Sequence, residues 1–204
     1  MKITILNILS LCSPLLAIVS GWRQRFTLLW FLAATGLIID NLGVLLVYLK
    51  IDQHWAGNIF ILAEFLFLSF YYKKYVYKRH YLFYIITGVT ALLFIIYTID
   101  NSIYHLNIVA AGILCAYYIF YSIVGFYIIL RNLDHIYLNE QPFFWANLAV
   151  FTYASANFIL FLSGSYLQKT NFRLLLEIWG TFFTSINIMH YLLIGISLYK
   201  TKRN

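Results

Sequence analysis

Long apolar runs separated by short polar breaks occupy the chain from one end to the other. The runs can be divided into seven: residues 3–20, 26–49, 55–72, 81–99, 104–130, 143–166 and 172–199. Each run has the length of a helix, whereas a strand that crosses a membrane needs only about ten residues in strict alternation. Pro142 is well placed for the first turn of its helix. The pattern predicts an all-α, polytopic membrane protein, a seven-transmembrane-helix bundle that forms one integral membrane domain over residues 1–204.

The composition agrees with this prediction. Of the 204 residues, 63% are hydrophobic and 10% are charged, whereas soluble domains have about 25% charged residues. About 20 apolar residues cross a bilayer, so seven spans use most of the chain and leave no length for a soluble domain. Cys12 and Cys115 both lie inside apolar runs, where cysteine behaves as a small hydrophobic residue and indicates no disulfide framework.

Basic residues are divided unevenly between the two ends of the predicted bundle. The loops after the first, third and fifth runs, with the C-terminal tail, hold Arg23, Arg25, Lys73, Lys74, Lys78, Arg79, Arg131, Lys200, Lys202 and Arg203. The positive-inside rule therefore places the N-terminus outside and the C-terminus in the cytoplasm. The net charge of +7 is spread over short loops, so we expect contacts with membrane lipids and no nucleic-acid partner.

The first run has two interpretations. Lys2, an apolar stretch, and then Ala17 and Ser20 could form a signal peptide that is cleaved. We favour a first membrane span, because Arg23 and Arg25 follow directly and anchor its far end on the cytoplasmic side.

Residues 71–84 interleave six tyrosines with four basic residues. Tyrosines gather at the membrane–water interface and cationic side chains reach for lipid phosphate, so the stretch predicts anchoring to lipid. The alternative is a docking site for a cytoplasmic or membrane protein partner at Lys73, Lys74, Lys78 and Arg79.

Two carboxylates interrupt the second and third runs. An ionisable group in hydrocarbon costs at least a few kcal/mol, so Asp40 and Glu64 should face the bundle interior or a water-filled cavity and mark function. With a rise of 1.5 Å per residue, Asp40 lies roughly 21 Å from the inner start of its run and Glu64 roughly 14 Å below the outer start of the next. The two acids are therefore at similar depth. Asp40 also shares a stripe with Ala33, Gly36 and Gly43, and such small residues let helices approach closely.

Polar residues of the sixth and seventh runs reach nearly the same depth and complete a predicted polar layer. The candidate ligand-binding residues are Asp40, Asn41, Glu64, Asn157, Glu177, Thr184, Asn187 and His190. Other interpretations stay open for several of them. Asparagine and threonine inside membrane helices often serve as interhelical hydrogen-bonding groups, Glu177 can snorkel to the surface, and His190 can be a satisfied core histidine.

Three stretches give the chain a resemblance to a known kind of protein: the acidic second run, Glu64-Phe65-Leu66-Phe67 continuing into Tyr71-Tyr72-Lys73-Lys74, and the tail Tyr199-Lys200. In layout the chain resembles small seven-span bacterial membrane proteins of unassigned function and the membrane portion of seven-helix sensor proteins. The resemblance implies a sensor-like or accessory role in the bacterial cytoplasmic membrane, with any signal passed to a separate partner.

The function we expect is non-enzymatic, with no catalytic residue assigned: binding of a small ligand or proton in an intramembrane polar cavity that opens toward the outer face. One alternative is a small proton-coupled carrier, because Trp30 to Asp40 and Trp145 to Ser155 share a faint pattern typical of a repeat. The other is an intramembrane metal-dependent lipid hydrolase using Asp40, Glu64 and His190. No spacing among the remaining histidines indicates a zinc motif, and no cofactor can be named.

Overall fold

The computed structural model of the chain describes residues 5–24, 27–76, 80–100, 108–131 and 137–201, which are almost entirely helical, with no strand among them. The elements are α1 (Ile5–Ser20), η1 (Trp22–Gln24), α2 (Leu28–Tyr48), α3 (His54–Val76), α4 (His80–Asp100), α5 (Ile108–Arg131), η2 (Leu138–Glu140), α6 (Pro142–Thr170), α7 (Phe172–Ile178), η3 (Trp179–Phe183) and α8 (Thr184–Thr201). The predicted all-α class is confirmed. The described helices match the seven predicted runs when α7, η3 and α8 are taken as one rod.

Helix boundaries follow local sequence signals. The Thr27 side chain accepts a hydrogen bond from the Trp30 backbone amide at 3.4 Å and caps the start of α2. Pro142 begins α6, as predicted. The predicted loop at residues 167–171 is too long, because α6 continues to Thr170 and only Asn171 interrupts it. The Asn171 side chain accepts a hydrogen bond from the Leu174 amide at 3.1 Å, which favours the start of α7.

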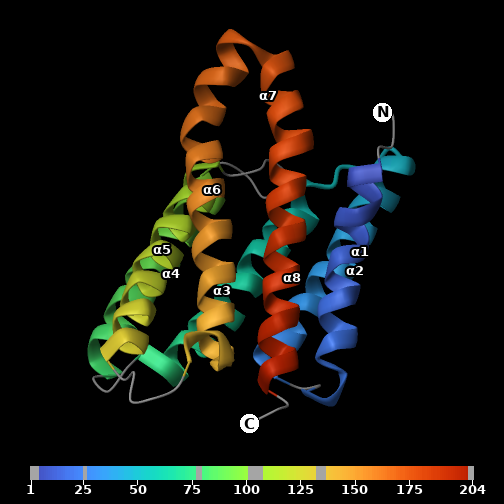
Figure 1. Cartoon of the computed structure of the whole chain (residues 1–204). Helices are drawn as coiled ribbons and strands as arrows, with labels where there is room; N and C mark the ends of the chain where they lie inside the picture. Colours follow the sequence, from blue (N-terminus) through green and yellow to red (C-terminus); the bar gives the residue numbers. More distant parts are fainter. Residues whose placement is uncertain (1–4, 25–26, 77–79, 101–107, 132–136, 202–204) are drawn as a thin grey trace.

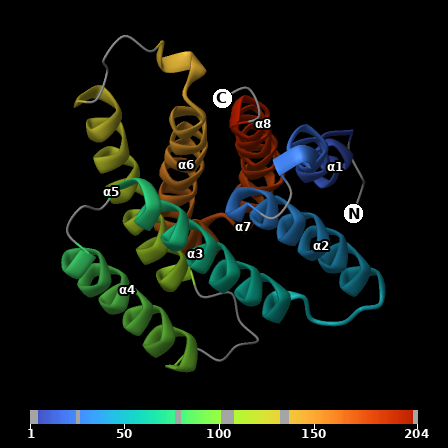
Figure 2. The ribbon, with the colours of Figure 1, turned by 90° about the horizontal axis from the view of Figure 1, so that it is seen from below.

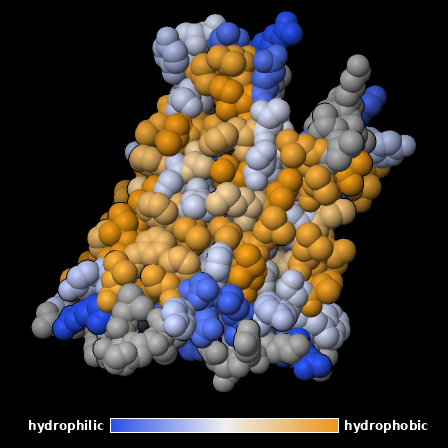
Figure 3. All heavy atoms as spheres, viewed as in Figure 1, coloured by the Kyte–Doolittle hydropathy of each residue, from blue (hydrophilic) through white to orange (hydrophobic). Residues whose placement is uncertain are grey.

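Within the described residues, six helices are long and apolar enough to cross a membrane, as expected of an integral membrane protein. They are α2 to α6 and the rod that ends with α8. The shorter apolar helix α1 has 16 residues, about 24 Å of rise against a hydrocarbon core of about 30 Å. Figure 3 shows apolar side chains over the middle of the visible face and hydrophilic side chains toward its two ends.

Six helices form a closed ring. Around the ring, α1 contacts α2, α2 contacts α3, α3 contacts α5, α5 contacts α6, α6 contacts α8, and α8 returns to α1. Helix α4 lies outside the ring, mainly against α5, as the end view in Figure 2 shows. Successive helices run in opposite directions when α7, η3 and α8 are counted as one rod. Helix α1 therefore begins at one end of the bundle, and α8 finishes at the other (Figure 1).

One end of the bundle collects basic residues. Helices α1, α3, α5 and α8 finish there (Figure 1). Their last turns and the short η1 helix supply Arg23, Lys73, Lys74, Arg131 and Lys200. We call this the basic end. Arg25, Lys78, Arg79, Lys202 and Arg203, which the sequence assigns to the same end, lie outside the described residues.

A buried polar network joins three helices of the ring toward the basic end. The Tyr72 hydroxyl donates to Asn147 Oδ1 at 2.9 Å and lies 2.8 Å from Ser122 Oγ, while Asn147 Nδ2 donates to the Ser122 carbonyl at 2.9 Å. All three residues are fully buried. A Cβ at Gly125 would lie 2.6 Å from Asn147 Oδ1, so glycine makes room for this amide. The network holds α3, α5 and α6 in one register.

Interface anchoring is a wrong prediction for part of the 71–84 stretch. Tyr71 and Tyr72 are buried in the bundle, because their rings pack on aromatic side chains of α5 and α6. Tyr75, Tyr81 and Tyr84 are exposed, as anchoring requires.

Candidate functional site

The two acids lie at matching depth in the ring. Counted along α2 and α3, Asp40 and Glu64 are each roughly 18 Å from the basic end. Glu64 is 5% exposed, and Asp40 is half-buried. Both belong to helices that form one side of the ring, so their neighbours come from the helices opposite.

Glu64 is surrounded by hydroxyl groups of aromatic side chains. Tyr118 on α5, Tyr153 on α6 and Tyr191 on α8 all lie close enough to interact electrostatically with its carboxyl group, as does the Cys115 thiol. The Tyr118 hydroxyl is buried and has no hydrogen-bond partner among the described residues. Glu64 is therefore buried near several groups that can donate a hydrogen bond to a carboxylate.

Asp40 lies near α8, and α1 contacts both α2 and α8. Its carboxyl group lies close to the Asn187 side chain, and Asn187 Nδ2 donates to Ser10 Oγ on α1 at 3.1 Å. One turn before Asp40, a Cβ on Gly36 would collide with the Tyr191 hydroxyl. The small residue predicted to allow close approach thus admits the Tyr191 ring to the neighbourhood of Asp40.

Two tyrosines connect the acids. Tyr153 and Tyr191 each interact electrostatically with both Asp40 and Glu64. Counted along their helices from the basic end, Tyr118, Tyr153 and Tyr191 are at roughly 15–20 Å, the same depth as the acids. We call these five residues, Asp40, Glu64, Tyr118, Tyr153 and Tyr191, the acid site. Glu64 is buried and Asp40 is half-buried, and a charge in such a place is costly, so the arrangement favours taking up a proton or a cation.

Three further candidates, on α6 and α8, are buried, and most of their polar groups have hydrogen-bond partners. His190 is buried, its Nδ1 donates to the Ala149 carbonyl at 3.1 Å, and its ring packs on Tyr153 with centroids 4.4 Å apart. Thr184 is buried and donates to the Gly180 carbonyl at 2.7 Å. Asn157 is buried, and its Oδ1 accepts no hydrogen bond from a described residue. His190 thus touches the acid site through Tyr153 and behaves as a satisfied core histidine.

Two candidates lie away from the acid site. Asn41 is exposed, and its Nδ2 donates to the Leu37 carbonyl of its own helix at 2.7 Å. Glu177 is exposed and pairs with Arg173, Nε to Oε1, at 3.2 Å. It belongs to α7, which projects beyond the other helices together with the end of α6 (Figure 1). Helix α6 has 29 residues and rises about 44 Å, more than the hydrocarbon core.

A π-helical turn explains why the predicted face of the last rod is wrong at Glu177. Uniform helical spacing predicts that Glu177, Gly180, Thr184, Asn187 and Tyr191 share one face of this rod. The segment Trp179–Phe183 is instead π-helical, which adds residues to a turn and rotates everything before it. Thr184, Asn187 and Tyr191 are buried as predicted, whereas Glu177 and Gly180 are exposed.

The described residues contain no cluster suited to a metal ion. No group of three or more His, Cys, Asp or Glu side chains among them lies close enough to hold one. Asp40, Glu64 and His190 are all described, so they are not gathered as the three ligands that the hydrolase alternative requires.

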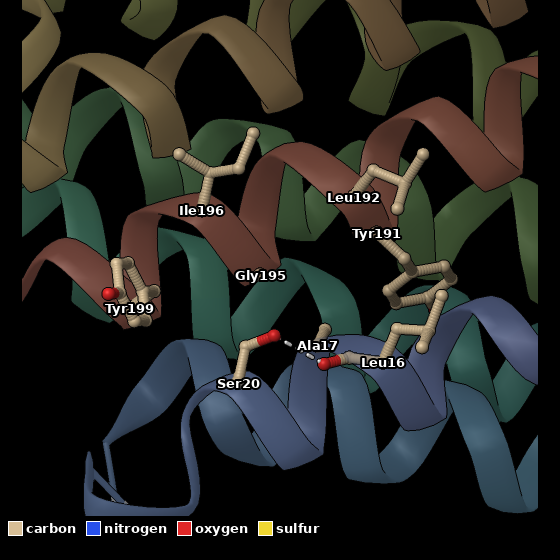
Figure 4. A pocket seen from close by; sticks show the side chains of 8 residues that line it. All are labelled: Leu16, Ala17, Ser20, Tyr191, Leu192, Gly195, Ile196 and Tyr199. Carbon is tan, nitrogen blue, oxygen red and sulfur yellow. Dashed lines mark hydrogen bonds between the residues drawn. The ribbon is translucent and has the colours of Figure 1, made fainter.

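Neither of two pockets found among the described residues is lined by the acids. One is a groove of about 220 Å³ between α1 and α8, where Ala17 and Gly195 bring the two backbones together (Figure 4). Tyr191 forms part of its wall, so this side chain faces both the groove and the acid site. The predicted cavity opening toward the outer face stays a prediction.

The sequence missed Tyr118, Tyr153 and Ser10. The position of the two tyrosines in the sequence could have identified them. Tyrosines usually lie at the membrane interface, whereas Tyr118 and Tyr153 lie in the middle of apolar runs.

Comparison of the chain with protein-family models, with curated proteins and with solved structures returns no match.

Proposed function

We propose that the protein is a sensor-like or accessory integral membrane protein that binds a proton, or a small ligand, at the acid site. The observation that supports this function is the enclosure of Asp40 and Glu64 at one depth, with Tyr153 and Tyr191 interacting with both. A proton is the ligand that fits best, because it can be held by a buried carboxyl group without any cavity. The tyrosine rings would also suit a small cation, since cations are attracted to aromatic faces.

The topology we propose has seven spans with the N-terminus outside and the C-terminus in the cytoplasm, in a bacterial cytoplasmic membrane. It is supported by the gathering of basic residues at the end where α1, α3, α5 and α8 finish. A protein partner would receive the signal at this end, with Lys73 and Lys74 as described contact residues.

Thermal unfolding of the purified protein in detergent tests the binding function. We expect the midpoint to change with pH, and to rise with millimolar ammonium or ethanolamine if a small cation binds. Asp40→Asn and Glu64→Gln should each reduce the pH response, and the double variant should abolish it. Glu177→Gln is the matched control, because it makes the same Glu-to-Gln substitution at an exposed carboxyl group. This variant should respond to pH as the wild type does. A double variant with the full wild-type response would refute the proposal.

A proton-coupled carrier is a second candidate with its own support. Helices α1 to α3 and α5, α6 and α8 contribute three helices each to the ring, while α4 lies outside. Three, one and three helices is the arrangement that the faint repeat between Trp30–Asp40 and Trp145–Ser155 suggests. In proteoliposomes a carrier should take up a solute when a pH gradient is imposed, and should lose uptake in Glu64→Gln. No gradient-driven uptake across a solute panel would favour the sensor-like function.

A further inference from the structure

A second pocket opens at the basic end between α3, α5, α6 and α8. Its volume is about 340 Å³ and its walls include Tyr75, Ile128, Phe143 and Thr201. Typical ligand sites have about 300–1,000 Å³, so the pocket is large enough for part of a small ligand. The Tyr75 ring stacks on Phe143 with centroids 4.5 Å apart. The pocket offers an aromatic and aliphatic surface to an apolar group.

Three of the helices that line this pocket carry basic residues close in sequence to its lining. Lys74 Nζ lies 5.4 Å from the centroid of the Tyr75 ring, so its ammonium group is held at the pocket wall. Arg131 follows the last pocket residue of α5 by two positions, and Lys200 immediately precedes Thr201. The apolar pocket therefore opens at the basic end of the bundle.

Neighbouring Lys73 points elsewhere. Its Nζ lies 5.0 Å from the ring of Tyr84 on α4, outside the helix ring. The exposed Glu140 of η2 is the acidic residue described near the pocket, next to Gln141 in its lining. Among the described residues of these helix ends, one carboxylate stands against Lys74, Arg131 and Lys200, which is an excess of positive charge.

We propose that this pocket binds an anionic phospholipid of the leaflet at the basic end. The lipid phosphate would lie among Lys74, Arg131 and Lys200, and the first part of an acyl chain would contact Ile128 and Phe143. An apolar pocket at the basic end of membrane helices fits an anionic amphiphile. A free anion would leave the apolar wall without a partner, and a zwitterionic lipid would leave the excess charge uncompensated. This inference does not depend on the acid site.

The test uses the full chain, purified and stripped of lipid in mild detergent. Dioleoyl phosphatidylglycerol, dioleoyl phosphatidylcholine and inorganic phosphate are titrated separately, and binding is followed by native mass spectrometry and by the thermal unfolding midpoint. We expect phosphatidylglycerol to bind and to raise the midpoint, whereas phosphatidylcholine and phosphate leave it unchanged. If phosphatidylcholine raised the midpoint as much as phosphatidylglycerol does, the proposal would be overturned. If inorganic phosphate did so, the ligand would be a soluble anion, and the proposal would be overturned as well.

Paired variants locate the binding. Lys74→Gln with Lys200→Gln should weaken phosphatidylglycerol binding by about fivefold for each lost cation. Lys73→Gln with Arg23→Gln removes the same charge at the same end, away from the pocket lining, and should change binding less than threefold. Thr201→Trp fills the pocket mouth from an exposed position and should also reduce binding. Equal loss in the two double variants, or unchanged binding in Thr201→Trp with a normal lipid-free midpoint, would contradict a site in this pocket.

Discussion

Gly36→Ala should destabilise the protein by about 2 kcal/mol and disturb the acid site. The new Cβ would collide with the Tyr191 hydroxyl and would lie 2.8 Å from ring carbon Cζ. The hydroxyl is at the end of a rigid ring that is 2% exposed, so relief requires movement of the whole side chain or of α2. Reversible unfolding in mixed detergent and SDS micelles measures the free-energy change.

Gly43→Ala is the matched control on the same helix. Its Cβ would lie 3.5 Å from the Gln53 side chain, an ordinary contact, and alanine favours a helix over glycine by up to about 1 kcal/mol. We expect it to be neutral or stabilising. Tyr191→Phe removes the hydroxyl that the new Cβ meets, so it should recover part of the loss caused by Gly36→Ala. If Gly36→Ala were as stable as Gly43→Ala, the close approach of Tyr191 to α2 would be wrong.

Asn147→Leu should lower the free energy of unfolding by about 2 kcal/mol. The substitution removes the acceptor for Tyr72 and the donor to the Ser122 carbonyl. Hydrogen bonds between membrane helices contribute about 0.6–2 kcal/mol each, and leucine has no polar atom to replace either. The same unfolding assay measures the effect.

Asn41→Leu provides the comparison for Asn147→Leu. Asn41 is exposed and bonds only to the Leu37 carbonyl of its own helix among the described residues, so the change should stay within about 0.5 kcal/mol. Tyr72→Phe should fall between the two, since Asn147 keeps its bond to Ser122. Similar values for all three variants would show that the network does not hold α3, α5 and α6 together.

The existence and approximate limits of the helices could be predicted from the sequence, because apolar runs of this length have few other structures in a membrane. The predicted run 26–49 became α2 (Leu28–Tyr48), and the run 81–99 became α4 (His80–Asp100). The sequence also predicts that Asp40 lies on a stripe of small residues, and two members of that stripe, Ala33 and Gly36, are buried. These features depend on spacing within one helix, which the sequence shows directly.

Features that depend on relations between helices could not be predicted. Helix α4 is as apolar as its neighbours, so nothing in its sequence shows that it lies outside the ring. The π-helical turn at Trp179–Phe183 has no marker in a uniform helical pattern, and it turned Glu177 away from the predicted face. Tyr72, within a tyrosine-rich stretch typical of an interface, is buried because Ser122 and Asn147 of other helices meet its hydroxyl.

The central claim is that Asp40 and Glu64 form one proton-binding site through Tyr153 and Tyr191. Infrared difference spectroscopy during a pH titration tests it most directly, because a protonated carboxyl group has its own carbonyl band. We expect two such bands, one lost in Asp40→Asn and the other in Glu64→Gln, and in each variant the remaining carboxyl should lose its proton at a different pH than in the wild type. Bands that titrate at the wild-type pH when the other acid is replaced would contradict a shared site.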